Sequence, residues 1–306
     1  MLIIQLFREL LPLLGLGYLI GRFKPKLSFQ IARPLINFGV PVSLIGLLLK
    51  SGMDWQLLEA LGMALFAIGL IMGLIRIIPN LRSLIGSRSL LLGSAFGNTG
   101  YFGIPVSLAL LPAESLSFSI GYDIGATLFV WSLGPILLAR PSFALKELRA
   151  GRTLFYVFAS SPATKGLLGA MLLQLTPWSS QITSFLWFPS RIVIALALIV
   201  VGIRLASLGP ARNPNRSNHR GIQTTLLIKL IILPVLMLLL AKAFSVPILM
   251  RNALVLQAAT PTALSVLLLA EASEKEQEIA GSIVAWSTMA ATVTIPTWLL
   301  ILQRLA

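Results

Sequence analysis

Apolar residues along this chain are grouped into long continuous runs that polar stretches separate. A helix that crosses the hydrocarbon core of a bilayer needs about 20 mostly apolar residues. Ten runs meet this requirement approximately, and the predicted spans are 2–21, 30–49, 56–78, 89–111, 118–139, 161–176, 182–204, 222–243, 248–270 and 278–302. The pattern predicts an all-α integral membrane protein, because a transmembrane β-barrel would show alternating segments of about ten residues instead.

The composition agrees with a lipid-facing exterior and excludes several kinds of chemistry. Of the 306 residues, 57% are hydrophobic and 11% are charged, whereas a soluble domain carries about 25% charged residues. The chain has no cysteine and one histidine, His219, which excludes thiolate metal sites and leaves little for a histidine-based metal site or an intramembrane enzyme. We therefore expect no metal, no cofactor and no catalytic residues.

The chain has a net charge of +14, and its lysine and arginine residues are unevenly distributed along the sequence. These residues gather in the first, third, fifth and seventh loops between the predicted spans, at Arg22, Lys24, Lys26, Arg82, Arg88, Arg140, Lys146, Arg149, Arg152, Arg212, Arg216 and Arg220. Cytoplasmic loops carry such an excess, so the odd loops are predicted to be cytoplasmic and both termini to lie outside. No nucleic-acid partner is expected.

The two halves of the chain match one another at a constant shift of 161 residues. Spans one to five then fall on spans six to ten, and because five is odd the second half enters the membrane inverted. This predicts a single membrane transporter domain over 1–306, with a first five-helix repeat at 1–139, a cytoplasmic loop at 140–160 and a second, inverted repeat at 161–306. Chance similarity between apolar helices is the alternative.

Two of the predicted spans contain residues that interrupt a helix. The fourth span carries GNTGYFGIP from Gly97 to Pro105, and the ninth carries QAATPTALS from Gln257 to Ser265. Glycine and proline are unfavourable inside a helix, and a discontinuous helix at membrane depth must be covered by protein or line a water-filled cavity. Matching breaks in two halves point to a transporter's binding site. Tight packing at the glycines and kinks at the prolines are the alternative.

Each break is expected to leave the N-terminus of a half-helix near the middle of the membrane. Thr260 followed by Pro261 is typical of an N-cap and a first helical position, so the ninth span is predicted to stop near Ala259 and to restart at Pro261. The fourth span is predicted to stop near Gly97 and to restart after its glycines, at or before Pro105. Free N–H groups and the positive end of the helix dipole would favour an anion there.

Polar side chains in and near the breaks are further candidates. Donors for an anion are expected from Asn98, Thr99, Thr260 and Thr262. Tyr101 either lines the site or fills a gap. Asp123, inside the fifth span, either carries a coupling proton or caps the start of its helix at the interface. Lys229, about a third of the way into the eighth span, is expected to extend its ammonium toward the membrane surface.

Several of these segments resemble a known family. GNTGYFGIPVSLALLP resembles the fourth-helix signature of the auxin efflux carrier family, which includes bacterial malonate- and malate-type permeases and the plant auxin carriers. KLIILPVLMLLL is similar to that family's eighth helix, and LQAATPTALSVLLLAEA with WSTMAATVTIPTWLLIL is similar to its last two helices. The long hydrophilic loop of many plant members is missing, which argues against a plant-type auxin carrier.

The resemblance implies ten helices in two inverted five-helix repeats. Helices one, two, six and seven would form a scaffold. The other helices would form a moving core, in which the broken helices four and nine cross. Alternating access would be elevator-like. It also implies organic anions as substrates and places the substrate site at Asn98, Thr99, Gly100, Thr260 and Pro261.

Together these observations predict a secondary transporter, or permease, for a small organic anion such as a carboxylate. The predicted substrate-binding residues are Asn98, Thr99, Gly100, Tyr101, Pro105, Thr260, Pro261 and Thr262. Proton, sodium or no coupling ion all stay open, and there is no G-x-x-x-x-G-K-[ST] signature for ATP. The expected partners are the anion and the bilayer, a homodimer is left open, and the expected location is the bacterial inner membrane.

A sodium-coupled symporter of the bile-acid-carrier type is the alternative, and a channel is a weaker one. The symporter would be expected to have carboxylates around the crossing. In the sequence no acidic residue adjoins either break, which argues against it.

Overall fold

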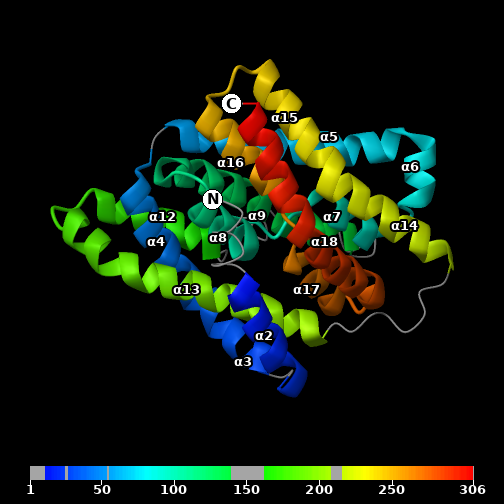
Figure 1. Cartoon of the computed structure of the whole chain (residues 1–306), viewed down its shortest axis with the longest axis horizontal. Coiled ribbons are helices and arrows are strands. Elements are labelled where there is room, and N and C mark those ends of the chain that lie inside the picture. The colour runs from blue at the N-terminus through cyan, green and yellow to red at the C-terminus, as the bar shows by residue number, and fades with distance from the viewer. Residues whose placement is uncertain (1–10, 25–26, 54, 139–161, 208–215, 306) are drawn as a thin grey trace.

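Figure 1 shows the computed structural model of the chain, which describes residues 11–24, 27–53, 55–138, 162–207 and 216–305. Regular structure in these residues is helical, and the one β-bridge among them joins Gly97 to Thr262. Each of the ten predicted spans is mainly helical over its described part, with non-helical breaks in the fourth and the ninth, so the all-α prediction is confirmed. The start of the first span and the loop at 140–160 lie outside the described residues.

The helices follow one another in the order of the predicted spans. In the first half they are α2 (Leu11–Phe23), α3 (Leu27–Pro34), η1 (Leu35–Gly39), α4 (Val40–Ser51), α5 (Trp55–Ile77), α6 (Pro79–Leu84), α7 (Arg88–Ala95), η2 (Thr99–Gly103), α8 (Ile104–Leu110), η3 (Ala113–Ser115) and α9 (Leu116–Leu138). In the second half they are α12 (Pro162–Gln174), α13 (Ser179–Ser207), α14 (Arg216–Leu227), η4 (Ile228–Ile232), α15 (Leu233–Ala243), α16 (Ile248–Ala258), α17 (Leu264–Ala272) and α18 (Gln277–Arg304).

The described helices have the length and the surface of membrane spans. Four stretches are long and apolar enough to cross a bilayer, at Trp55–Ile77, Ser179–Val200, His219–Ala243 and Gln277–Arg304. Large apolar side chains also cover the outside of the molecule; on α13, for example, Phe185 is 77% exposed and Phe188 is 70% exposed. Apolar surface on this scale is expected where a protein faces lipid. The chain is therefore an integral membrane protein.

The helices pack as two groups, which we name the scaffold group and the core group (Figure 1). The scaffold group consists of α2, α3, η1, α4, α12 and α13, with α13 lying along both α2 and α4. The core group consists of α5, α7, η2, α8, α9, α14, η4, α15, α16, α17 and α18, and it contains most of the main buried apolar cluster. A second apolar cluster joins the groups, because Leu44, Leu47 and Leu48 of α4 pack with Ile120 and Ile124 of α9.

Three π-helical turns each end two residues before a proline. They are η1 before Pro41, η2 before Pro105 and η4 before Pro234. Proline has no N–H, so the carbonyl four residues before it loses its α-helical partner, and a wider turn relieves the clash with the ring. Next to η4 the orphaned carbonyl is that of Leu230, and Trp298 of α18 donates its indole N–H to this oxygen at 2.9 Å. Sequence and packing thus stabilise the π turn of the eighth span together.

Candidate functional site

The two broken spans cross by direct backbone pairing. Gly97 and Thr262 form an antiparallel bridge. On one side of it the N–H of Asn98 donates to the carbonyl of Pro261 at 2.7 Å, and on the other the N–H of Ala263 donates to the carbonyl of Phe96 at 3.0 Å. Backbone groups that each broken helix leaves free are thus satisfied by the other, which is how unwound chain is tolerated inside a membrane protein. We refer to residues 96–98 and 259–263 as the crossing.

The fourth span breaks close to the predicted place. α7 ends at Ala95 with Phe96 as its C-cap, and the chain becomes helical again at Thr99 in η2. The α-helix itself resumes at Ile104, after the last glycine and just before Pro105. The π turn extends this half-helix toward the crossing, because the Asn98 carbonyl accepts from the N–H groups of both Phe102 and Gly103 at 3.1 and 3.0 Å.

The ninth span stops where predicted but restarts later. α16 ends at Ala258 with Ala259 as its C-cap, whereas α17 starts at Leu264 with Ala263 as its N-cap. The prediction of an N-cap at Thr260 followed by a first helical position at Pro261 was therefore wrong. The physical reason is the crossing, since Pro261 lies outside the helix where its carbonyl accepts from the opposite break.

Three predicted hydroxyl donors are at or beside the crossing, but their protons are used inside the protein. Thr99 donates to the Oδ1 of Asp123 at 2.5 Å. Thr260 donates to the carbonyl of Gln257 at 2.7 Å, and Thr262 donates to a carbonyl of α7 at 2.8 Å. Pro261 explains the second of these bonds, because without an N–H it cannot donate to the carbonyl four residues before it. In this conformation the hydroxyl oxygens can offer only lone pairs to a ligand.

The side chain of Asn98 makes no cap hydrogen bond to the helix that follows it. The residue is buried, with 5% of its surface exposed, and its backbone is held at both its N–H and its carbonyl. A primary amide carries two N–H donors and one carbonyl acceptor. Backbone bonds therefore fix the position of Asn98, while its side-chain amide is not used to cap the following helix.

The other predicted residues of the fourth span lie around η2. Gly100 faces Asp123, and a Cβ atom at Gly100 would lie 3.2 Å from the Oδ1 of that carboxyl group, so glycine allows the close approach. Pro105 is buried at the start of α8. Tyr101 is half-buried and packs against the main apolar cluster and against Ala197 and Val200 of α13. It thus fills space between the core group and the scaffold group.

Asp123 is brought to the crossing from another span. α9 begins at Leu116, so Asp123 lies two turns inside its helix, and the alternative that it caps the start of that helix was wrong. Its carboxyl group lies instead against the first turn of η2, where it accepts from Thr99 and approaches Gly100. Acidic groups are stabilised at this end of a helix. The view that no acidic residue adjoins either break holds for the sequence but not for the fold.

Two further polar residues at the crossing were not selected from the sequence. Lys229 in η4 is fully buried and donates its ammonium to the carbonyl of Ala258 at 2.5 Å, so the expectation that it extends toward the membrane surface was wrong. Gln257 is fully buried, its Nε2 donates to Ser107 at 3.3 Å, and its Oε1 has no partner among the described residues. The sequence offered a clue to Lys229, because an ionisable residue inside a membrane span is by default a candidate for a functional role.

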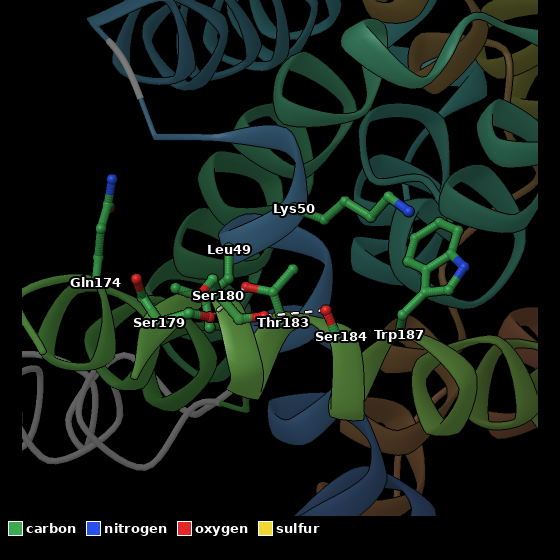
Figure 2. Close-up of a pocket in the computed structure, with 8 residues that line it drawn as sticks. All are labelled: Leu49, Lys50, Gln174, Ser179, Ser180, Thr183, Ser184 and Trp187. Atoms are coloured by element: carbon green, nitrogen blue, oxygen red, sulfur yellow. Dashed lines mark hydrogen bonds between the residues drawn. The ribbon is translucent and has the colours of Figure 1, made fainter. Parts of the chain in front are cut away.

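A separate polar cavity of about 640 Å³ lies in the scaffold group (Figure 2). Its lining comes from the end of α4, the end of α12 and the start of α13, as Leu49, Lys50, Gln174, Ser179, Ser180, Thr183, Ser184 and Trp187. Lys50 extends toward Trp187, with its ammonium 3.8 Å from the ring centroid, as Figure 2 shows. None of the predicted substrate-binding residues lines this cavity.

No group of three or more histidine, cysteine, aspartate or glutamate side chains arranged to hold a metal ion occurs in the part of the chain that the structure describes. The polar groups of the crossing are instead two backbone breaks, one carboxyl group, one ammonium, two amides and several hydroxyls.

The comparisons with known proteins agree with this architecture. Residues 157–299 match the model of a family described as membrane transport protein. The chain is also 26% identical over 215 residues to an uncharacterized transporter of Methanothermobacter thermautotrophicus, an alignment that covers 70% of this chain and 67% of that protein. The matched family region contains the ninth-span break and Lys229. Over this region the chain is similar to the membrane transport protein family, the family of the auxin efflux carriers.

Proposed function

We propose that this membrane transporter is a secondary active permease for a small organic anion, with the substrate site at the crossing. The observation that carries the proposal is the backbone pairing of Gly97 with Thr262, which brings two helix breaks from opposite halves of the chain together. Breaks in corresponding positions of two halves are the best pointer to a transporter's binding site, and irregular backbone at membrane depth is tolerated only where protein covers it or where it lines a cavity.

The polarity of the crossing supports a binding role. Fully or nearly buried polar side chains are concentrated there, and they include Asn98, Thr99, Asp123, Lys229, Gln257, Thr260 and Thr262. Polar groups in a membrane interior are costly and mark substrate or ion pathways. A role in packing alone would be served by apolar residues such as those of the main buried apolar cluster.

The charges favour a carboxylate whose binding is coupled to a proton. The first turn of η2 is the positive end of a half-helix, but Asp123 already lies against it. An anionic substrate at the same turn would meet a like charge while Asp123 is ionised, and protonation of Asp123 removes that repulsion. In this scheme Asp123 carries the coupling proton, and the Asn98 amide supplies donors to the substrate.

Elevator-like alternating access is part of the proposal and is supported by the division into two packed groups. The crossing belongs wholly to the core group, and the contact between the groups contains the apolar cluster of α4 and α9 together with Tyr101. The clustered side chains of this contact are apolar, and an apolar contact suits a sliding surface. The ten helices would then form two inverted repeats of five, with both termini outside and the loop at 140–160 in the cytoplasm of a bacterial cell.

The sodium-coupled alternative gains one observation and is opposed by another. The fold supplies a carboxyl group beside the fourth-span break, which the sequence did not show. A buried ammonium, however, already lies at the ninth-span break. The proton-coupled permease therefore accounts for more of the crossing.

The proposal is tested by uptake in proteoliposomes, with radiolabelled malonate and malate as probes. Asn98→Ala combined with Thr260→Ala is expected to abolish uptake that the wild type shows. The matched control changes the same residue types on exposed surfaces, as Asn80→Ala with Thr297→Ala, and is expected to keep wild-type uptake. Wild-type uptake by the crossing double variant would overturn the proposed site.

A further inference from the structure

Lys229 is a buried charge that the proposed transport scheme does not use. It lies in the π turn η4, its side chain is fully buried, and its ammonium contacts a backbone carbonyl rather than a carboxylate. An ammonium taken out of water is strongly destabilising unless polar groups compensate it. The geometry of the crossing identifies the compensating groups.

The first compensating group is the C-terminus of α16. The Ala258 carbonyl would ordinarily accept from the N–H of residue 262, but the N–H of Thr262 donates instead to the hydroxyl of Ser287 at 3.0 Å. The ammonium of Lys229 takes the vacated position on the Ala258 carbonyl at 2.5 Å. This carbonyl belongs to the last turn of α16, where the helix dipole is negative, so the site favours a cation.

The second group is the opposite break. A Cβ atom at Gly97 would lie 3.0 Å from the Nζ of Lys229 and 3.2 Å from its Cε, and it would overlap the hydroxyl of Thr260. The ammonium therefore lies against the bare backbone of Gly97, with the Thr260 hydroxyl nearby. Backbone carbonyl oxygens at half-helix C-termini and in unwound segments are the ligands that hold coupling cations in transporters with broken helices.

We propose that the ammonium of Lys229 is a built-in cation of the crossing, bound in the position that an exchangeable Na⁺ would otherwise occupy. The crossing is then complete without a monovalent cation from solution. One consequence rests on the proposed function: transport is independent of sodium. The positive charge that neutralises the C-terminus of α16 is covalently attached, so it cannot be exchanged between the two sides of the membrane.

The charge is placed asymmetrically between the two halves. At the predicted shift of 161 residues, Lys229 corresponds to Ile68 in α5, which is also fully buried. The first half therefore has an apolar side chain where the second half has a cation. The ammonium is a feature of one break and is not required by the packing of the corresponding helices.

Thermal unfolding of the purified protein tests the inference without any substrate. The wild type, Lys229→Ala and Lys229→Met are compared in choline chloride, sodium chloride and methylammonium chloride at equal ionic strength. Lys242→Ala, a change of an exposed lysine on the adjoining helix α15, is the matched control. A cation that binds the folded state only raises Tm by mass action.

The wild type and the control are expected to have the same Tm in all three salts. Lys229→Ala is expected to unfold at a lower temperature in choline and to regain about 2–4 °C in sodium or methylammonium, the shift expected for a site about 90% occupied in a chain of this size. Lys229→Met is expected to lose stability without regaining it, because the longer side chain fills the space. Stabilisation of the wild type by sodium over choline would overturn the proposal, and so would full stability of Lys229→Met or no response of a folded Lys229→Ala to either cation.

Uptake separates this inference from the proposed function. Malonate uptake by the wild type is expected to be equal in sodium and choline media. Absence of any carboxylate uptake would argue against the proposed substrate class and leave the cation result standing, whereas carboxylate uptake that requires sodium would overturn the built-in cation and leave the permease standing.

Discussion

Replacement of Asp123 by asparagine removes the one carboxyl group that lies against the first turn of η2. The amide keeps the size of the side chain, and its carbonyl oxygen can still accept from Thr99, which now donates to Oδ1 at 2.5 Å. The change therefore removes the charge and the exchangeable proton while it preserves the contact with Gly100. We expect Asp123→Asn to bind the anion without any contribution from a proton.

The size of the effect follows from the geometry. For an anion bound at this turn at a distance of roughly 5 Å from the carboxyl group, two unit negative charges repel by about 3 kcal/mol at an effective dielectric constant of about 20. This repulsion corresponds to about 150-fold in Kd. As the pH rises and Asp123 loses its proton, the affinity of the wild type for malonate should fall by up to this factor, whereas the affinity of Asp123→Asn should stay constant.

The assay has two parts. Thermal-shift titrations with malonate across a pH series give the two affinity profiles, since a ligand that binds the folded state raises Tm by an amount that depends on the logarithm of its concentration relative to Kd. In proteoliposomes, Asp123→Asn should still exchange labelled for unlabelled malonate but should no longer accumulate malonate when a pH gradient is imposed. Glu59→Gln, a change of an exposed acidic residue in α5, is the matched control and should behave as the wild type.

Two outcomes would refute the reasoning. Accumulation driven by a pH gradient in Asp123→Asn would show that the proton travels elsewhere. A wild-type affinity for malonate that does not change with pH, in a protein that does transport malonate, would show that the anion never meets the charge of Asp123. Either result would leave Asp123 as a group that only positions Thr99.

Two further predictions concern stability. Trp298→Phe should lower the free energy of unfolding by about 1–3 kcal/mol, because the Leu230 carbonyl, which has no α-helical partner at Pro234, loses its indole donor. The control Trp286→Phe on an exposed face should change the free energy of unfolding little. Equal effects of the two changes would contradict this prediction. Glu276→Ala should cost about 0.5–2 kcal/mol in the same denaturation assay, since its carboxylate accepts from the N–H of Ser89 at 2.7 Å and caps α7, and a loss no greater than that of the exposed Lys275→Ala would argue against the cap.

The spans and the breaks could be predicted because both depend on local sequence. A run of apolar residues is sufficient for a membrane helix, and a glycine- or proline-rich segment such as residues 97–105 disrupts the helical bonding of its own neighbourhood. The stop of the ninth span at Ala258 and the return to α-helix at Ile104 follow from such local effects. Of the predicted residues, Asn98, Thr99, Thr260, Pro261 and Thr262 were accordingly found at or beside the crossing.

The partners of the polar groups could not be predicted, because each is fixed by residues far away in the chain. The ninth span was predicted to restart at Pro261 but restarts at Leu264, because its backbone pairs with a break about 160 residues earlier in the chain. Asp123 and Lys229 were visible as charged residues inside spans, but the sequence does not state which helix end each one faces. A buried charge is stabilised by whatever dipole and oxygen atoms surround it, and these come from other helices.

The sequence by itself determined that this chain is a helical membrane protein with two interrupted spans, because hydrophobic periodicity and helix-breaking residues act within a few positions of the chain. Only the tertiary structure decided that GNTGYFGIP pairs with the second break, that a carboxyl group lies against one half-helix and that an ammonium lies at the end of another. The physical reason is that hydrogen bonds and charge compensation inside a membrane are satisfied between helices, and the order of residues along one helix does not specify its neighbours.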